Sequence, residues 1–145
     1  MSVIEITGSV SLIMTKQPLC VTKNHILDDV RTLMEQKNIR HVPVIDDGKL
    51  VGILSKTDLE KLSLLDKSVS QSMSTEQFMT KGVHALQQDD SIKDAAELLS
   101  LGSYHALPVL DGEMVVGIVT STDLIDFLLN HHKYLFRNYS LPSID

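Results

Sequence analysis

The chain has 145 residues, of which 43% are apolar and 22% are charged, and its formal net charge is −6. A chain of this length can bury one substantial core or two smaller half-cores that share an interface. The acidic balance argues against a nucleic-acid surface, and the N-terminal MSVIEITGSVSLIMTK lacks the basic start and long apolar run of a signal peptide or membrane span. We therefore expect a cytoplasmic protein that binds neither nucleic acid nor membrane.

The first half of the chain predicts elements in the order β-α-β-β-α. A short extended piece, PLCV (18–21), precedes an amphipathic helix with apolar residues on one face. Two strands follow, HVPVID (41–46) and KLVGIL (49–54), and Asp47-Gly48 between them suits a tight hairpin. A closing helix begins at Thr57-Asp58. The apolar residues of the two helices are Ile26, Val30, Leu33 and Met34, then Leu59, Leu62 and Leu65.

A polar, serine-rich segment, DKSVSQSMSTEQ (66–77), separates this half from the next. Its composition predicts a linker. Its alternating serines fit either phosphorylation sites or, more simply, a solvated connector.

The second half predicts the same order of elements. VHAL (83–86) precedes a helix carrying Ile92, Ala95, Ala96 and Leu99, with capping oxygens at 89–91 and Gly102 at its end. ALPVLDG (106–112) and EMVVGIVT (113–120) supply the two strands, and the last helix begins at Thr122-Asp123.

The two halves align at a constant offset of 65 residues. IMTK (13–16) falls on FMTK (78–81), RHVPVIDD (40–47) on HALPVLDG (105–112), and GILSKTDL (52–59) on GIVTSTDL (117–124). Such a register indicates an internal repeat. Each unit has a sheet face too large for its own short helices to cover, so we expect the pair to be the folding unit.

These repeated motifs resemble a tandem cystathionine-β-synthase (CBS) domain pair, also called a Bateman module. The resemblance covers about residues 10 to 130 and implies an α/β (α+β) fold of two β-α-β-β-α repeats packed sheet to sheet with pseudo-two-fold symmetry. We expect repeat 1 at 10–65, the linker at 66–77, repeat 2 at 78–132 and an aromatic C-terminal tail at 133–145. The resemblance implies a stand-alone regulatory module that binds AMP, ADP, ATP or S-adenosylmethionine between its repeats and signals to an unknown regulated protein.

A ligand-binding role for the two aspartates would explain why the stretch that contains them occurs twice. A carboxylate that accepts hydrogen bonds from both hydroxyls of a ribose makes a charge-assisted contact, and the start of a helix favours its ionised form. A helix-capping role fits the same residues. The resemblance implies that Asp58 and Asp123 bind ribose and that neighbouring hydroxyls contact ribose or phosphate. These hydroxyl residues are Ser55, Thr57, Thr120 and Thr122.

The resemblance also implies phosphate contacts from Arg40, His41 and His105, which precede the two equivalent prolines. Ala106 stands where repeat 1 has His41, so we expect stronger phosphate binding on the Arg40 side. A surface salt bridge is the alternative role for Arg40. The backbone around Leu19 and His84 is expected to bond the adenine edge.

Two other classes of function compete with this interpretation. An enzyme is disfavoured, because the six histidines show no metal-binding spacing, no nucleophile or P-loop motif occurs, and Cys20 stands alone. We expect no catalytic residues, no metal and no catalytic cofactor. The other class is a structural or interaction module whose dimer face or tail is its function.

The C-terminal helix, LIDFLLNHHKYLF (124–136), carries apolar residues on more than one side, which predicts a homodimer. Three aromatic residues gather just beyond repeat 2, in YLFRNY (134–139). This tail either packs on its own module, covers a dimer partner or binds a target protein.

Overall fold

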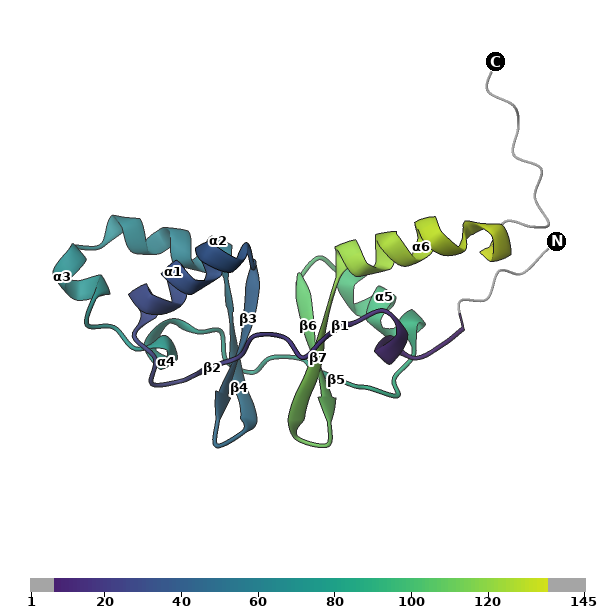
Figure 1. Ribbon diagram of the computed structural model, residues 1–145, viewed down its shortest axis with the longest axis horizontal. Coiled ribbons are helices and arrows are strands. Elements are labelled where there is room, and N and C mark those ends of the chain that lie inside the picture. Colours follow the sequence, from purple (N-terminus) through teal and green to yellow (C-terminus); the bar gives the residue numbers. More distant parts are fainter. Residues whose placement is uncertain (1–6, 136–145) are drawn as a thin grey trace, which may run out of the picture.

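The computed structural model describes residues 7–135 and has the α/β architecture expected of the repeat (Figure 1). Repeat 1 contains β2 (Val21–Thr22), α1 (Leu27–Lys37), β3 (His41–Asp46), β4 (Lys49–Ser55), α2 (Lys56–Glu60) and the 3-10 helix η2 (Lys61–Leu64). Repeat 2 contains β5 (Leu86–Gln87), α5 (Ile92–Ser100), β6 (Ala106–Asp111), β7 (Met114–Thr120) and α6 (Ser121–Leu135). Short elements precede and join them: η1 (Val10–Leu12), β1 (Thr15–Lys16), α3 (Lys67–Ser70) and α4 (Thr75–Phe78).

The two repeats place their hairpins at the centre of the molecule and their helices on the flanks (Figure 1). The strand order is β2-β3-β4-β7-β6-β5, and β4 meets β7 through the single pair Lys49 and Met114. The first hairpin turns at Asp47 and Gly48, whose φ angles of 51° and 80° are those that a type I′ turn requires. Local sequence therefore sets both hairpins, and their docking places repeat 1 against repeat 2.

Each helix begins and ends where its local residues allow. Ser91 caps α5, because its Oγ accepts a hydrogen bond from the Asp94 amide at 3.0 Å, and Gly102 follows the helix at a φ of 77°. The first helix starts one residue later than its apolar pattern indicates, since Ile26 is the extended N-cap residue and 46% exposed. Leu59 and Leu62 are buried as expected, whereas Leu65 lies beyond η2 and is 40% exposed.

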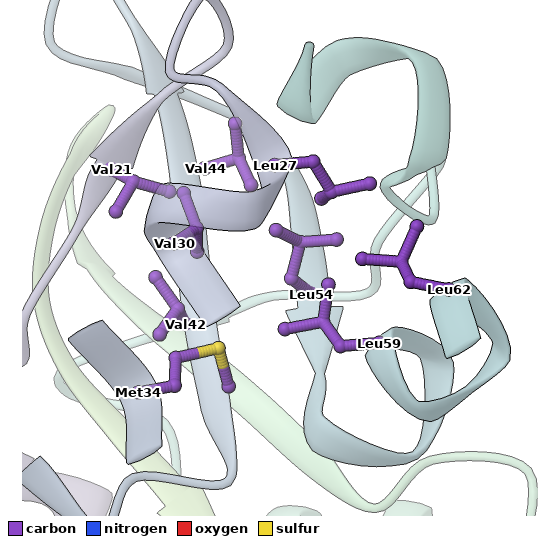
Figure 2. Packing of buried hydrophobic residues seen from close by; sticks show 9 residues of the cluster. All are labelled: Val21, Leu27, Val30, Met34, Val42, Val44, Leu54, Leu59 and Leu62. Carbon is purple, nitrogen blue, oxygen red and sulfur yellow. The ribbon is translucent and has the colours of Figure 1, made fainter. Parts of the chain in front are cut away.

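Each repeat has its own apolar core. In repeat 1, α1 and α2 pack onto one face of the strands (Figure 2). The buried residues are Val21, Leu27, Val30, Met34, Val42, Val44, Leu54, Leu59 and Leu62. The core of repeat 2 is built from Val10, Leu86, Ala95, Leu99, Leu107, Val109 and Val119. Val10 is the exception to the pattern, because it comes from the N-terminal end of repeat 1.

The N-terminal segments of the two repeats are exchanged between them. The Val10 amide donates to the Asp90 carbonyl at 2.8 Å, and at the symmetry-related position the Thr75 amide donates to the His25 carbonyl at 2.8 Å. Likewise Thr15 pairs with Ile118, and Thr80 pairs with Ile53. We call residues 8–16 and 73–81 the exchanged arms. The N-terminal arm lies beside α5 in Figure 1.

A methionine on each arm lies on a glycine of the opposite repeat. A β-carbon added at Gly52 would stand 2.8 Å from Cγ of Met79, and one added at Gly117 would stand 2.8 Å from Cγ of Met14. Real β-carbons do not approach other atoms this closely. Each repeat therefore needs a glycine in its second strand because the other repeat's methionine occupies the space of a side chain.

The segment expected as a solvated linker is more ordered than its composition indicated. It contains α3 and the start of α4, and α4 begins with a capping box formed by Ser74 and Gln77. Thr75 is fully buried, and Met73 packs against the repeat 1 core. Polar composition misled here because Thr75 directs its hydroxyl to the His25 carbonyl at 2.9 Å, which lets a polar residue be buried.

The C-terminal helix α6 continues to Leu135, past the expected end of repeat 2 at 132. Residues 136–145 of the aromatic tail lie outside the described residues. Within 7–135 no helix combines the length and apolar character needed to cross a membrane.

The exchange of arms predicts a coupled effect of substitutions at Gly117 and Met14. Gly117→Ala should destabilise the protein by about 1–3 kcal/mol, because the new methyl group overlaps the Met14 side chain. In a Met14→Ala background the added cost of Gly117→Ala should fall well below that value. Chemical unfolding of the parent, both single variants and the double variant measures this coupling.

Gly52 and Met79 provide the matched comparison. There the Thr80 carbonyl oxygen also stands 2.9 Å from an added β-carbon, so Met79→Ala should relieve Gly52→Ala only in part. Simple additivity at Gly117 and Met14 would contradict the proposed contact.

Candidate functional site

The doubled aspartates lie where the second strand of each repeat turns into a helix. β4 ends at Ser55 and α2 follows, with Asp58 in its first turn. In repeat 2, β7 ends at Thr120 and α6 follows, with Asp123 in its first turn. Both carboxylates therefore sit at the positive end of a helix, where an ionised acid is favoured.

The two helix starts are capped in opposite ways. In repeat 1 the Ser55 hydroxyl accepts a hydrogen bond from the Asp58 amide at 3.0 Å. In repeat 2 the Asp123 carboxylate is the acceptor: its Oδ2 receives the Thr120 amide at 2.8 Å and the Thr120 hydroxyl at 3.3 Å. Both bonds go to one oxygen, which leaves Oδ1 of Asp123 for another donor.

Asp58 is less engaged than Asp123. In the described part of the chain its carboxylate accepts no hydrogen bond, and its one ion pair is with Lys61 at 3.9 Å. Burial raises the pKa of Asp123, and the two bonds from Thr120 oppose that rise. The remaining predicted hydroxyl residues, Thr57 and Thr122, are exposed in the first turns of α2 and α6. The first turns of α2 and α6 thus carry the same residue types, but their aspartates make different hydrogen bonds.

The predicted phosphate-binding residues come from both repeats. His41 opens β3, is half-buried and pairs across the hairpin with Ser55. Arg40 is exposed, and its carbonyl accepts a hydrogen bond from the Lys56 amide at 2.7 Å, which fixes it beside the start of α2. His105 is exposed and directly precedes β6 of the other repeat.

Strand pairing and hydrogen bonds bring the repeat 1 residues together, because His41 lies opposite Ser55 and the Ser55 hydroxyl accepts the Asp58 amide. Burial lowers the pKa of His41, and the positive charges of His105 and Arg40 lower it further, while the Asp58 carboxylate opposes the shift. The fold therefore holds Arg40, His41 and Asp58 at the start of α2, and His105 occupies the position in repeat 2 that Arg40 has in repeat 1. We call Arg40, His41, Asp58 and His105 the cleft cluster.

The predicted adenine-edge residues lie just before the short strands β2 and β5. Leu19 is half-buried, whereas His84 is exposed and its ring lies 5.5 Å from that of Tyr104. Sequence reasoning missed Tyr104, which precedes His105 in the chain and whose ring packs against His84 and the repeat 2 core. The alignment of the repeats could have identified Tyr104, because it places this aromatic residue where repeat 1 has Ile39.

A separate groove of about 340 Å³ lies between α1 and α2. Its apolar floor is Met34, Ile39 and Leu59, and charged residues surround it: Arg31, Glu35, Lys56 and Glu60. None of the predicted ligand-binding residues lines this groove. Because its charges alternate in sign on two helices, it offers a surface for another helix better than a site for a polyphosphate.

Two stretches of the chain, residues 9–64 and 76–130, match the sequence profile of the CBS domain. Each stretch contains one of the two β-α-β-β-α units together with its exchanged arm.

Curated relatives include both large and small proteins. The chain is 34% identical over 117 residues to homoserine O-acetyltransferase of Methanohalobium evestigatum, which covers 79% of this chain and 23% of that protein. It is 30% identical over 117 residues to the CBS domain-containing protein YhcV of Bacillus subtilis, covering 81% and 83% of the two chains. The chain spans less than half the length of the first curated relatives it matches.

Solved structures have the same fold. A putative acetoin utilization protein (AcuB) from Vibrio cholerae superposes with a TM-score of 0.77 at 29% identity, covering 93% of this chain and 98% of that one. A CBS domain pair in complex with 5′-methylthioadenosine and S-adenosyl-L-methionine gives 0.75 at 29% identity, with 86% and 98% covered. CBSX2 in complex with AMP gives 0.76 at 29% identity, with the same coverage.

The lowered pKa of His41 predicts a pH dependence of stability. Because the pKa in the folded state lies below the unfolded value of about 6.5, the contribution of His41 is fully present above pH 6.5. It is lost as the pH falls through the folded-state pKa, since the unfolded chain binds the proton more readily. His41→Gln should therefore flatten the decline in the free energy of unfolding as the pH falls below about 6.5.

Chemical unfolding of the parent and His41→Gln at several pH values checks this expectation. One proton changes the slope by at most about 1.4 kcal/mol per pH unit, and solvent screening of a half-buried ring leaves only a fraction of that. Parallel curves for the parent and His41→Gln would show that His41 titrates normally.

Proposed function

This chain belongs to the CBS domain family, and from that premise we propose that it is a regulatory module that binds an adenosine-containing ligand between its two repeats. The candidates are AMP, ADP, ATP and S-adenosylmethionine. A CBS pair of the same fold was solved with AMP and another with S-adenosyl-L-methionine and 5′-methylthioadenosine, which supports this ligand class.

The cleft cluster is the observation that carries the proposal. It combines a carboxylate at a helix start, suited to a ribose diol, with an arginine and two histidines, suited to phosphate. Asp58 and Asp123 take the ribose, with Ser55, Thr57, Thr120 and Thr122 beside them. Arg40, His41 and His105 take the phosphates, and the backbone near Leu19 and His84 takes the adenine edge.

The regulatory mechanism follows from the shared position of the site. A ligand that touches both repeats favours the relative arrangement in which its contacts are best, and a regulated protein can bind that arrangement selectively. The homoserine O-acetyltransferase resembles this chain over 23% of its own length, and an L-aspartate semialdehyde sulfurtransferase does so over 21%. We infer that this chain has the regulatory role and no catalytic role of its own.

A homodimer is the proposed assembly. Ile125, Leu128 and Leu129 on α6 are 55%, 41% and 65% exposed, which is a large apolar surface for one helix. The groove between α1 and α2 offers further apolar surface on repeat 1. These surfaces also support the alternative function, an interaction module without a nucleotide.

Sedimentation velocity at micromolar concentration should give the mass of two chains. A Leu128→Glu, Ile125→Glu double variant should shift the protein to the monomer, because two charges would then face an apolar interface. Leu12→Glu, on η1 where the side chain is 72% exposed, is the control and should leave the dimer intact. A monomeric parent would refute the assembly.

Ribose and phosphate contacts should respond differently to substitution. Asp58→Asn and Asp123→Asn should weaken adenosine, AMP and ATP alike, since all three carry the ribose. Losing the charged acceptor should cost about 1.5–3 kcal/mol, or about ten- to a hundredfold in affinity.

Arg40→Ala should weaken ATP binding more than AMP binding and leave adenosine binding nearly unchanged, because the lost attraction scales with ligand charge. Titration calorimetry with the three ligands measures these effects.

Two further variants serve as controls. Glu60→Gln and Asp126→Asn remove a negative charge from α2 and α6 without altering the first-turn aspartates, and both should bind as the parent does. If the parent binds none of AMP, ATP and S-adenosylmethionine and none of them raises its melting temperature, the interaction module is the better description.

A further inference from the structure

The outer helical surfaces of the two repeats differ in a complementary way. In repeat 1 the groove of about 340 Å³ between α1 and α2 has Glu60 and Ser63 among its lining residues. The equivalent positions of repeat 2 are Ile125 and Leu128 of α6, whose side chains are 55% and 41% exposed. Repeat 1 thus presents a hollow with polar edges where repeat 2 presents exposed apolar side chains.

Ile125 and Leu128, which we call the α6 stripe, stand three residues apart and therefore lie on one face of the helix. Apolar surface of this kind gains free energy when it is removed from water. The floor of the groove is also apolar, being formed by Met34, Ile39 and Leu59. A helix that laid the α6 stripe into the groove would cover both apolar surfaces in one contact.

The charges around these surfaces favour α6 as the occupant of the groove. Lys56 lines the groove and has no ion-pair partner within residues 7–135. Asp126, which follows Ile125 on α6, is exposed and equally lacks an ion-pair partner in that range. Docking α6 in the groove brings opposite charges towards each other. Docking α6 against a second α6 would bring two Asp126 carboxylates together and would leave the groove unfilled.

The arrangement of the helices allows the contact to form twice in one dimer. Figure 1 shows α1 and α2 on one flank and α6 on the other, all on the side of the molecule away from the hairpin tips. A second copy that faces this side with its flanks reversed would place its α6 over the groove of the first copy. Its own groove would then receive the α6 of the first copy. The same two surfaces are used twice, which closes a symmetric dimer.

We propose that the groove between α1 and α2 is the docking site for α6 of a second copy of this chain. The dimer is then head to tail, with repeat 1 of each copy against repeat 2 of the other. This inference rests on the homodimer of the proposed function, whose interface it specifies, and does not depend on the nucleotide. The contact joins the two helices whose first turns carry Asp58 and Asp123, α2 of one copy and α6 of the other.

Opposite charges introduced at Ser63 and Leu128 test the orientation of the dimer. Ser63→Lys and Leu128→Glu should each raise the dissociation constant of the dimer about tenfold or more in sedimentation equilibrium, because each places one charge in an apolar contact. A chain with both changes should recover most of the lost affinity, since a head-to-tail dimer pairs the two opposite charges. A head-to-head dimer would place like charges together, so a double variant that dissociates more than either single variant overturns the proposal.

Cross-linking gives a second readout that does not depend on weakened binding. In a Cys20→Ser background, chains with Ser63→Cys and chains with Leu128→Cys are mixed, allowed to exchange subunits and treated with a short bis-maleimide. We expect covalent dimers that contain one chain of each kind, and few from either variant alone. Efficient cross-linking of Leu128→Cys to itself, or none in the mixture, overturns the proposal.

Ser100→Cys in the same background is the matched control for Ser63→Cys. Both serines are exposed, and each donates its hydroxyl to the carbonyl three residues earlier, at 2.7 Å for Ser100 and 2.8 Å for Ser63. Ser100 belongs to repeat 2, so in a head-to-tail dimer it faces repeat 1 of the other copy. It should therefore not cross-link to Leu128→Cys.

The outcomes separate this inference from the proposed function. A dimeric parent that fails the charge and cross-linking tests overturns the assigned interface and leaves the homodimer standing. A parent that sediments as a monomer overturns both. A dimer that passes both tests but binds neither AMP nor ATP supports this inference and overturns the nucleotide proposal.

Discussion

The contact of a methionine from each exchanged arm with a glycine of the opposite repeat is the constraint on which the rest of the structure depends. Met14 lies on Gly117 and Met79 lies on Gly52, so each repeat fills a gap in the strand of the other. The hydrogen bonds of Val10 and its counterpart close the same exchange at the helix starts. Neither repeat has a complete core without the other, and their relative position is therefore set by packing and not only by the joining segment.

Because packing sets the relative position of the two repeats, residues from both can contribute to one site. The cleft cluster draws Arg40, His41 and Asp58 from repeat 1 and His105 from repeat 2. A small rotation of one repeat would change the distance between the two histidines while leaving each local fold intact. A ligand that contacts both sides can therefore bias the arrangement of the pair, which is the physical requirement for a sensor.

The two repeats share the methionine and glycine contact and differ at the candidate site. The methionine and glycine positions are kept in both repeats, because the exchange needs them twice. At the helix starts the Asp58 amide donates to the Ser55 hydroxyl in repeat 1. In repeat 2 the Thr120 amide donates to the Asp123 carboxylate. The cationic residues are unevenly distributed, with Arg40 and His41 on one side and His105 on the other. Symmetry of the fold thus coexists with asymmetry of the site.

The sequence by itself determined the repeat, the order of the elements and the place of Asp58 and Asp123 at helix starts, because hairpin turns, helix caps and apolar periodicity depend on residues close together in the chain. Only the tertiary structure decided that the arms are exchanged, that Thr75 of the polar segment is buried, and that the Tyr104 ring packs against His84. These contacts join segments that are tens of residues apart or more. No local pattern specifies which distant segment a methionine will cover or which charges will face His41, since that depends on how the two repeats dock.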